Sequence, residues 1–388
     1  MKTNVGFIIN FNPSKWLGGF NYIKNLIFFL EKFKIKNINP VIITNNKNYF
    51  KKEYKLGKID ILETNIVSNN NFFIRVLGKM LIIIFGKNYF LEKFLTKNKI
   101  QAISHFEYTG KNSRVKSFVW FPDFQEIHFP KYFSLKSRLL RKFNLWMAAT
   151  HSTKILISSN SVLDDIKKIN KKAFRKSILI KHAINLPKIK IKKDLHKKFG
   201  IKKKYFIVPN TYWMHKNHFV LLKAINFLKK NKKEINFQIV TTGYFFDHRN
   251  PHYAISIKNY LIDNKLTEDF LILNIIKFQD LINLIKNSVA LINPSKSEGW
   301  SNSVEQALAL NKKIIVSNIK IHKEQNENKE FLFFKEDNYK QLATILEKEI
   351  KNYKKEKPIY KINLSENYEI KQKKFIENFE KIIMDNNY

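Results

Sequence analysis

Two glutamates lie seven positions apart in residues 293–310, where an apolar run gives way to a polar loop and then to an Ala/Leu-rich stretch. The run 289–292 predicts a buried strand, and the stretch from Ser303 predicts a helix. In open α/β sheets, ligands bind at the carboxyl ends of the strands, which is where this loop places Glu298, with Glu305 in the first helical turn. Carboxylates that accept hydroxyls, beside a helix N-terminus that attracts phosphate, predict a site for a phosphorylated sugar.

From Glu298 the chain reads EGWSNSVEQALAL, and NKKIIVSNIKIHKEQ follows. Both stretches resemble the donor-site motif of retaining, nucleotide-sugar-dependent glycosyltransferases of the GT-B fold, which form the group 1 or family 4-like glycosyltransferases. The usual motif separates its glutamates by seven residues, whereas six separate them here, as in a subgroup that reads EGWS. A purely structural interpretation stays open for part of the motif, because Asn302 and Glu305 have the spacing of a helix capping box.

The resemblance implies a role for each of these residues. Glu298 would bind hydroxyls of the donor sugar and stabilise the positive charge that develops on it, and Glu305 would hold the ribose hydroxyls. Lys216 and the backbone amides near the helix start would hold the diphosphate. The remaining residues that we expect around the nucleotide are Gly299, Ser301, Asn302, Ser303 and Asn217.

Lys216 lies in the sequence PNTYWMHKNH, residues 209–218, between a predicted strand and a predicted helix. An ammonium at a helix start neutralises the charge of a pyrophosphate leaving group. Many relatives carry an arginine five residues before this lysine, but Thr211 stands there in this chain. The alternative is that Lys216 is one more surface lysine in a lysine-rich protein.

The first half of the chain offers weaker candidates. Gly18 and Gly19 are predicted to lie in a loop after the first strand, where the resemblance implies contact with the donor phosphate or the acceptor. Relatives also carry a His-Asp pair after a later strand, but Pro122 replaces the histidine. Asp123 and His128 are therefore the candidates for contact with the donor sugar there, and His105 is comparable. A lone histidine is more often structural than catalytic.

The length of 388 residues predicts two domains. Apolar runs such as 5–9, 41–44, 205–208 and 237–240 predict buried parallel strands, so the fold class is α/β. With the resemblance, this implies the GT-B architecture of two Rossmann-like domains with a cleft between them. We expect an acceptor-binding domain over 1–186, a linker over 187–203, a nucleotide-sugar-binding domain over 204–364, and a helix over 365–388 that packs back toward the first domain.

The chain is strongly basic, with 71 Lys+Arg against 32 Asp+Glu and a formal net charge of +39. This charge alone is compatible with a nucleic-acid or anionic-polymer binder, yet it is spread along the chain and no nucleic-acid-binding motif accompanies it. Compositional drift toward lysine and attraction to an anionic membrane are two other interpretations of this charge. Residues 71–99 combine large apolar side chains with Arg75, Lys79, Lys93 and Lys97 on one side of a helical wheel, which predicts either an interfacial helix or a core-packed helix with a basic edge.

The absence of cysteine fits a reducing compartment, and no signal peptide or sufficiently long apolar segment is visible. We therefore expect a cytoplasmic enzyme, peripheral on the inner face of the cytoplasmic membrane. The predicted activity moves a sugar from a nucleoside diphosphate sugar to a glycan or lipid-linked acceptor in polysaccharide synthesis, without a metal or other cofactor. A GT-B sugar-nucleotide hydrolase or epimerase is the alternative enzyme.

Overall fold

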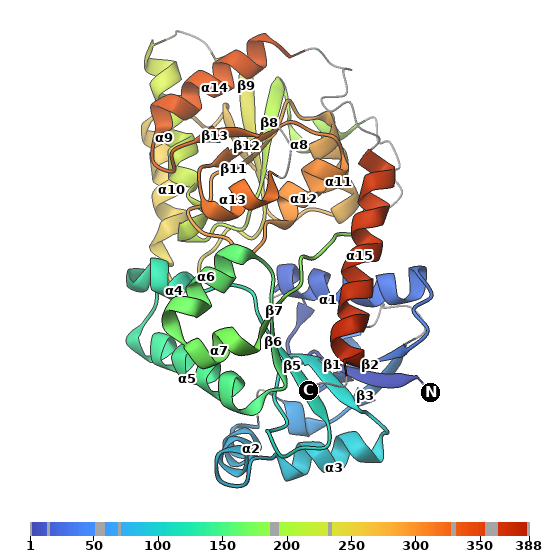
Figure 1. The fold of residues 1–388 in the computed structure, drawn as a ribbon. Coiled ribbons are helices and arrows are strands. Elements are labelled where there is room, and N and C mark those ends of the chain that lie inside the picture. Colours follow the sequence, from blue (N-terminus) through green and yellow to red (C-terminus); the bar gives the residue numbers. More distant parts are fainter. Residues whose placement is uncertain are drawn as a thin grey trace. The chain divides into compact units, whose positions relative to one another are not determined.

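The chain forms two compact units in a computed structural model (Figure 1). The N-terminal unit comprises Met1–Phe124, Leu135–Ile184 and Glu369–Tyr388, and the C-terminal unit comprises Gln125–Ser134 and Asn185–Tyr368. The structure describes all residues except 1, 14–15, 51–58, 69–70, 187–193, 232–234, 327–330, 354–363 and 386–388. The first seven residues of the predicted linker thus lie outside the described residues. Its later part contains α8, Leu195–Phe199, whose Leu195 is buried in the core of the C-terminal unit.

A parallel sheet of seven strands, in the order β3-β2-β1-β4-β5-β6-β7, forms the centre of the N-terminal unit. Its strands are β1 Thr3–Ile8, β2 Ile38–Thr44, β3 Asp60–Glu63, β4 Ala102–His105, β5 Lys116–Phe121, β6 Lys154–Ile157 and β7 Ser177–Leu179. Its helices are α1 Leu17–Lys32, α2 Phe72–Phe85, α3 Tyr89–Lys97, α5 Leu135–His151, α6 Asn160–Ile169 and α7 Lys171–Lys176.

The last helix, α15 Leu364–Met384, returns to the N-terminal unit from Glu369 onward. Its apolar residues Phe375, Ile376 and Phe379 belong to the same buried cluster as β1 and α1, and the rings of Phe7 and Phe379 lie 6.0 Å apart. This helix therefore completes the core of the first unit with residues from the end of the chain (Figure 1).

A second parallel sheet, of six strands in the order β10-β9-β8-β11-β12-β13, forms the C-terminal unit. Its strands are β8 Lys204–Pro209, β9 Phe237–Thr242, β10 Phe270–Ile272, β11 Leu291–Asn293, β12 Ile314–Ser317 and β13 Leu332–Phe334. Its longer helices are α9 His218–Asn231, α10 His252–Asp263, α11 Phe278–Asn287, α12 Asn302–Ala309 and α14 Tyr339–Lys351, and α4 Gln125–His128 and α13 Lys320–Gln325 are short. Two parallel α/β sheets of this kind confirm the predicted α/β fold class with two Rossmann-like domains.

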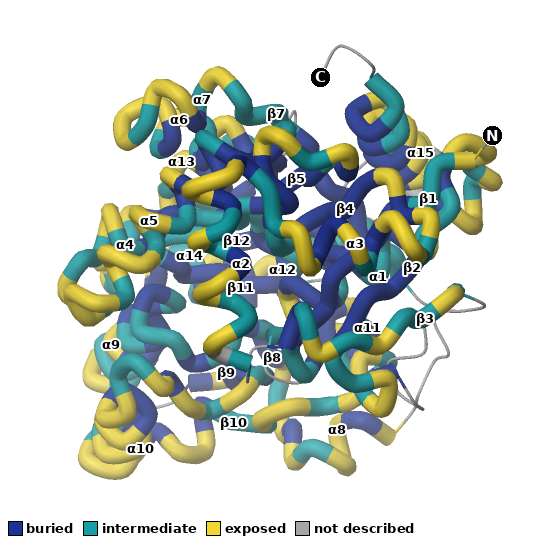
Figure 2. The backbone as a smooth tube through the Cα atoms, turned by 90° about the horizontal axis from the view of Figure 1, so that it is seen from below, coloured by how far each residue is buried: buried dark blue, intermediate teal, exposed yellow. Residues whose placement is uncertain are grey.

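The apolar runs of the sequence explain why these strands are central. The central strands of both sheets are buried, whereas helices such as α5 and α10 carry exposed stretches (Figure 2). Strands of a parallel sheet are covered on both faces, so they need continuous apolar sequence rather than alternation. Among the helices that the structure describes, none is long and apolar enough to cross a membrane.

The strand order of the C-terminal sheet places its switch point between β8 and β11, from which the chain continues in opposite directions across the sheet. Crevices at the carboxyl ends of such neighbouring strands are the usual ligand sites of open α/β sheets. The loop after β8 carries Lys216 and the loop after β11 carries Glu298. The topology therefore brings together two residues that lie far apart in the sequence.

Candidate active site

Backbone and amide contacts hold the two loops at the switch point against each other. Asn210, directly after β8, donates from Nδ2 to Asn293 Oδ1 at the end of β11 across 3.1 Å. Farther along, the N–H of Lys296 donates to the carbonyl oxygen of His215 across 2.8 Å. Because His215 is buried, this second bond fixes the backbone immediately before Lys216.

Lys216 and Glu298 form an ion pair between these loops. Lys216 Nζ donates to Glu298 Oε1 across 2.6 Å, and the two side chains are only 14% and 8% exposed. Asn293 Nδ2 lies 3.3 Å from the same oxygen. The residue predicted to bind the diphosphate and the residue predicted to bind the sugar are thus direct partners.

The electrostatics of the pair keep Glu298 charged. Burial alone would raise the pKa of Glu298, but the ammonium of Lys216, with a hydrogen bond from Ser295, lowers it below the usual value. A carboxylate that stays ionised in a poorly hydrated site can stabilise a neighbouring positive charge strongly, because little water screens it.

The N-terminus of α12 lies in the same loop and is capped by Ser301, whose Oγ accepts from the N–H of Val304. Asn293 Nδ2 donates to this Ser301 Oγ across 2.7 Å, and Ser303 Oγ lies 3.1 Å from it. The capping-box interpretation of Asn302 and Glu305 is therefore wrong, since the cap is one residue earlier and Glu305 is the fourth residue of the helix. An eight-residue helix beginning here directs its first N–H groups toward the loop that holds Glu298.

Glu305 is fully buried, and both of its carboxylate oxygens accept hydrogen bonds. Gln325 Nε2 donates to Oε1 across 3.2 Å, and Tyr368 donates from its hydroxyl to Oε2 across 2.9 Å. A ribose bound to Glu305 would share the carboxylate with these two side chains or displace one of them.

His322, at the start of α13, is buried close to the ion pair. Its Nδ1 lies 2.9 Å from the carbonyl oxygen of Ser317, which can only accept, so the ring proton is on Nδ1. The Ser317 hydroxyl in turn donates to the carbonyl oxygen of Ser295 in the Glu298 loop. Burial lowers the pKa of His322 to about 4, against the opposing effect of the Glu298 charge, so the imidazole is neutral near pH 7.

Other predicted residues take the following positions. Gly299 is buried in the same loop. Asn217 has a left-handed backbone, with φ of 56°, and donates from Nδ2 to the carbonyl oxygen of Glu336 across 2.7 Å. Gly18 and Gly19 lie in the first turn of α1 rather than in a loop, because that helix begins at Leu17. A Cβ atom on Gly19 would approach the ring of Trp16 to 2.7 Å, so this glycine is explained by packing.

The candidates from the first half of the chain take the following positions. Asp123 forms an ion pair with Arg141 at 3.8 Å in the N-terminal unit. His128 is the last residue of α4 and is exposed. His105 ends β4 with a φ of 83° and is fully buried among aromatic rings, where burial lowers its pKa to about 3. Their roles stay predictions.

Sequence reasoning missed several residues of the site. Asn293, Ser317, Gln325 and Tyr368 all contact predicted site residues or their loops, but each is an uncharged polar residue of a common type. In the sequence, the first three differ from other polar residues by their position at strand ends or in the quoted motif. Nothing in the sequence pattern indicates Tyr368.

A cavity of about 200 Å³ opens beside the Lys216 loop in the C-terminal unit. It is lined by Met214, Asn217, Phe219, Val220, Lys223, Tyr253, Lys296, Asp337 and Tyr132. No group of three or more histidine, aspartate and glutamate side chains placed to hold a metal ion occurs within the described part of the chain.

Comparison with known proteins shows which proteins the chain resembles. Residues 191–365, which include every element of the switch-point site, match the family described as "Glycosyl transferases group 1". The C-terminal part of the chain is thus similar to the group 1 glycosyltransferases over 175 of its 388 residues. The chain is also similar to "O-antigen chain mannosyltransferase RfbU" of Salmonella typhimurium, with 25% identity over 299 residues that cover 75% of this chain and 76% of the relative.

Solved structures share the fold of this chain over nearly its whole length. A glycosyltransferase from Rickettsia africae has a TM-score of 0.65 at 17% identity and covers 100% of both chains. HepE of Anabaena, solved with UDP and glucose, has a TM-score of 0.71 at 12% identity, covering 98% of this chain and 99% of HepE. At these identities the likeness concerns the fold.

Proposed function

We propose that this enzyme transfers a sugar from a nucleoside diphosphate sugar to a glycan or lipid-linked acceptor, with retention at the anomeric carbon, in cell-surface polysaccharide synthesis. The ion pair of Lys216 and Glu298 beside the N-terminus of α12 is the observation that carries this proposal. It places a cation and helix N–H groups for a diphosphate next to a carboxylate for a sugar. The name of the Salmonella mannosyltransferase and the UDP and glucose bound to HepE agree with this chemistry.

Each group has a distinct task in the proposed reaction. Lys216 and the first N–H groups of α12 stabilise the negative charge that the departing diphosphate gains. Glu298 binds hydroxyls of the sugar and stabilises the positive charge that develops at its ring. Glu305 binds the ribose. These groups perform the work of a metal ion, so we propose that transfer needs no divalent cation.

The donor side of the proposal is tested by thermal-shift measurements with a panel of nucleoside diphosphates and their glucose and mannose conjugates. At least one nucleoside diphosphate should raise the melting temperature, and its nucleoside should do so far less. Activity should persist in EDTA. Uniform stabilisation by every polyanion, including RNA, would instead support the anionic-polymer binder.

We further propose that the N-terminal unit binds the membrane surface that presents a lipid-linked acceptor, through a patch made of α2 and α5. On α2, residues at helical spacing are exposed although they are large and apolar: Phe73 84%, Val76 39%, Leu77 44%, Met80 50%, Ile83 45% and Ile84 64%. An amphipathic helix normally turns this stripe to the core. The outward-facing apolar stripe of α2 therefore favours the interfacial interpretation of this helix over the core-packed one.

Helix α5 extends the same surface. Lys79 of α2 donates from Nζ to Asn144 Oδ1 of α5 across 3.3 Å and lies 5.6 Å from the ring centroid of Phe143. On α5 the exposed apolar residues are Leu135 67%, Leu139 58%, Leu140 52%, Phe143 37% and Trp146 42%. Lys136, Arg138 and Lys142 are exposed between them. Apolar and aromatic side chains interleaved with basic ones fit an anionic bilayer surface.

Arg75 and Lys79 of the predicted helical wheel, and the neighbouring Lys87, have partners within the fold, whereas Lys93 and Lys97 of α3 are exposed. Arg75 forms an ion pair with Glu107 at 3.2 Å, and Lys87 forms one with Glu92 at 3.1 Å. Burial lowers the pKa of Lys79, which is bonded to α5. These three side chains hold the fold, so the exposed lysines and arginine of α5 are the better test of binding.

Co-sedimentation with vesicles tests this surface. Wild type should bind vesicles with anionic lipid and bind neutral vesicles weakly. Changing Lys136, Arg138 and Lys142 to Glu should weaken binding to anionic vesicles at least tenfold, since each basic residue contributes about 1 kcal/mol. Changing Phe73, Met80 and Ile84 to Ser should do the same.

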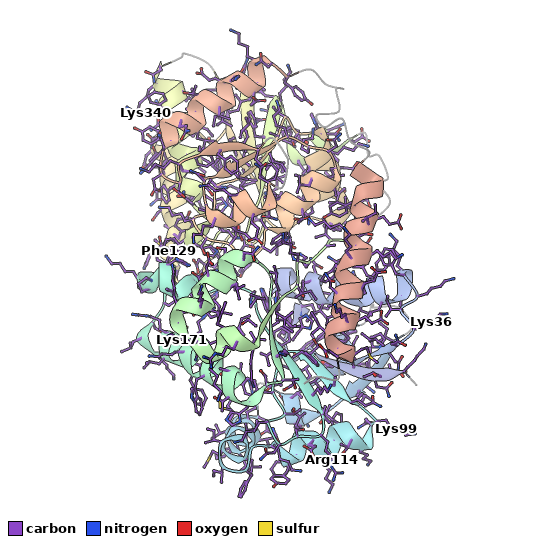
Figure 3. The ribbon with its side chains drawn as sticks, in the orientation of Figure 1. Lys36, Lys99, Arg114, Phe129, Lys171 and Lys340 are labelled. Atoms are coloured by element: carbon purple, nitrogen blue, oxygen red, sulfur yellow. The ribbon has the colours of Figure 1, made fainter. Side chains whose placement is uncertain are left out.

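A matched control replaces exposed apolar residues elsewhere. Ile255 and Ile262 on α10 are 54% and 65% exposed, and changing both to Ser should leave binding unchanged. Lysines are exposed on both units, among them Lys36, Lys99, Lys171 and Lys340 (Figure 3), so a non-specific charge effect is a real alternative. If the α10 control lost as much vesicle binding as the α2 and α5 variants, a specific patch would be contradicted. If the protein formed concentration-dependent dimers and the α2 changes abolished them, the patch would instead bind a second copy of the chain.

A further inference from the structure

A buried aspartate joins the loop after β9 to the loop that carries Lys216. Asp247 has no exposed surface, and its Oδ2 accepts from the N–H of Met214 across 3.0 Å. Its other oxygen, Oδ1, accepts from the N–H of Arg249 across 3.0 Å. Burial alone would raise the pKa of Asp247, but these N–H groups and the Arg249 charge lower it. The carboxylate therefore fixes the backbone of Arg249 relative to that of Met214, two residues before Lys216.

Two aromatic rings set the position of the Arg249 guanidinium. Its central carbon lies 4.8 Å from the ring centroid of Phe133 and 5.0 Å from that of Trp213, which is in the Lys216 loop. The side chain is 17% exposed. An arginine held between rings keeps its plane and its N–H directions, which prepares it to bind a planar or tetrahedral anion.

The polar contacts of this guanidinium use only part of its capacity to donate hydrogen bonds. Nη1 lies 3.4 Å from Gln125 Oε1, and Nε lies 3.5 Å from Asp247 Oδ1. Both contacts are long for charged donors, which usually bond at about 2.7–2.9 Å. No partner of Nη2 occurs within the described residues. A role confined to stacking would not require the five N–H donors of an arginine.

At the switch point, the cation described so far for a diphosphate is Lys216. The cation that the family resemblance expects five residues before Lys216 is absent, since Thr211 stands there. Lys216 itself is paired with Glu298 at 2.6 Å. Burial lowers the pKa of His215, and the charges of Lys216 and then Arg249 lower it further. The guanidinium therefore acts electrostatically on the same few residues as the ammonium.

We propose that Arg249 is the second cation of the donor site and binds the diphosphate in place of an arginine at position 211. This inference rests on the proposed function. The loop after β9 thereby contributes a positive charge that the loop after β8 lacks at position 211. Asp247 is the positioning residue that joins the two loops. Donor binding then uses two cations from neighbouring strand ends, with Lys216 shared between Glu298 and the phosphates.

Calorimetric binding of one nucleoside diphosphate and its nucleoside tests the proposal, with the base chosen as the one that stabilises wild type best. Arg249→Ala should weaken diphosphate binding at least tenfold and change nucleoside binding less than twofold. Arg249→Lys should recover part of the loss. Adding Thr211→Arg to Arg249→Ala should recover most of it, because the charge returns from the other loop.

Lys258→Ala is the matched control, since this lysine lies on α10 over the ring of Phe245 at 5.3 Å and its removal costs the same charge. It should leave both affinities unchanged. Equal losses of diphosphate and nucleoside affinity in Arg249→Ala would overturn the proposal and assign Arg249 to holding Gln125 and Phe133. Unchanged affinities would also overturn it. A wild type that binds no nucleoside diphosphate would instead refute the proposed function.

Discussion

Lys216 Nζ lies 2.6 Å from Glu298 Oε1, so the cation expected to bind phosphate and the carboxylate expected to bind sugar neutralise each other before the donor arrives. Donor binding must exchange this pair for two new ones, with phosphate oxygens at Lys216 and sugar hydroxyls at Glu298. The exchange keeps both charges partnered throughout, which limits the cost of desolvating them. Substituting either residue therefore also leaves the charge of the other without this partner.

Lys216→Ala should therefore have two effects. Binding of nucleoside diphosphate should weaken about tenfold or more relative to nucleoside, because charge-assisted hydrogen bonds to phosphate are lost. Glu298 would also become an unpaired, mostly buried carboxylate, at a cost of about 3 kcal/mol in the free energy of unfolding. Calorimetry and urea unfolding measure the two effects separately.

The double change Lys216→Ala with Glu298→Gln separates these contributions. It should restore most of the unfolding free energy, since no charge is left unpaired, while diphosphate binding stays weak. If the double variant also recovered diphosphate affinity, Lys216 would act only on stability and the diphosphate role would be wrong.

Tyr368→Phe tests whether Glu305 binds the ribose. The change removes the hydroxyl that donates to Glu305 Oε2. Nucleotide affinity should stay within a few-fold of wild type, whereas Glu305→Gln should weaken it about tenfold, because a ribose hydroxyl bonded to a carboxylate contributes about 1.5–3 kcal/mol. A matched comparison with the 2′-deoxynucleotide checks the assignment: Glu305→Gln should reduce the preference for ribose, and an unchanged preference would exclude the role.

Buried histidines make stability depend on pH. Burial lowers the pKa of His322 to about 4 and of His218 to about 3 in the C-terminal unit, so the unfolded chain binds these protons first. Stability should be fully present above about pH 6.5 and should fall as the pH drops toward 4, by about 1.4 kcal/mol per pH unit for each histidine. Urea unfolding followed between pH 7 and 4 measures this slope.

His322→Asn should reduce that slope by about one proton. The exposed His248, changed to Asn, provides the control and should leave the slope as it is. A His322→Asn variant with the wild-type slope would mean that this histidine takes up its proton equally in both states.

Some features were predictable from sequence because they depend on local pattern. Runs such as 205–208 and 237–240 predicted β8 and β9, since strands buried on both faces require continuous apolar residues. The three residues of β13 are too few to form such a pattern. The wheel of α2 showed two faces, but only the folded chain shows that the apolar one is exposed.

The candidate site likewise contains some residues that local motifs predict and others that they do not. Glu298 and Lys216 were found because their motifs are local, and the parallel sheet brings the loops together. Tyr368 reaches Glu305 from 63 residues away, and no spacing rule connects them. The shift of the helix cap to Ser301 depends on side-chain geometry that Asn302 could equally have supplied.

The most direct test of glycosyl transfer at this site compares Glu298→Gln with wild type in both turnover and nucleoside diphosphate affinity. Transfer to a lipid-linked glycan fraction should fall at least a hundredfold, because the carboxylate stabilises charge that exists only in the transition state. Diphosphate affinity should stay equal or rise, since Lys216 is released from its partner. Full transfer activity in this variant, or a loss of diphosphate affinity as large as the loss of turnover, would contradict the account.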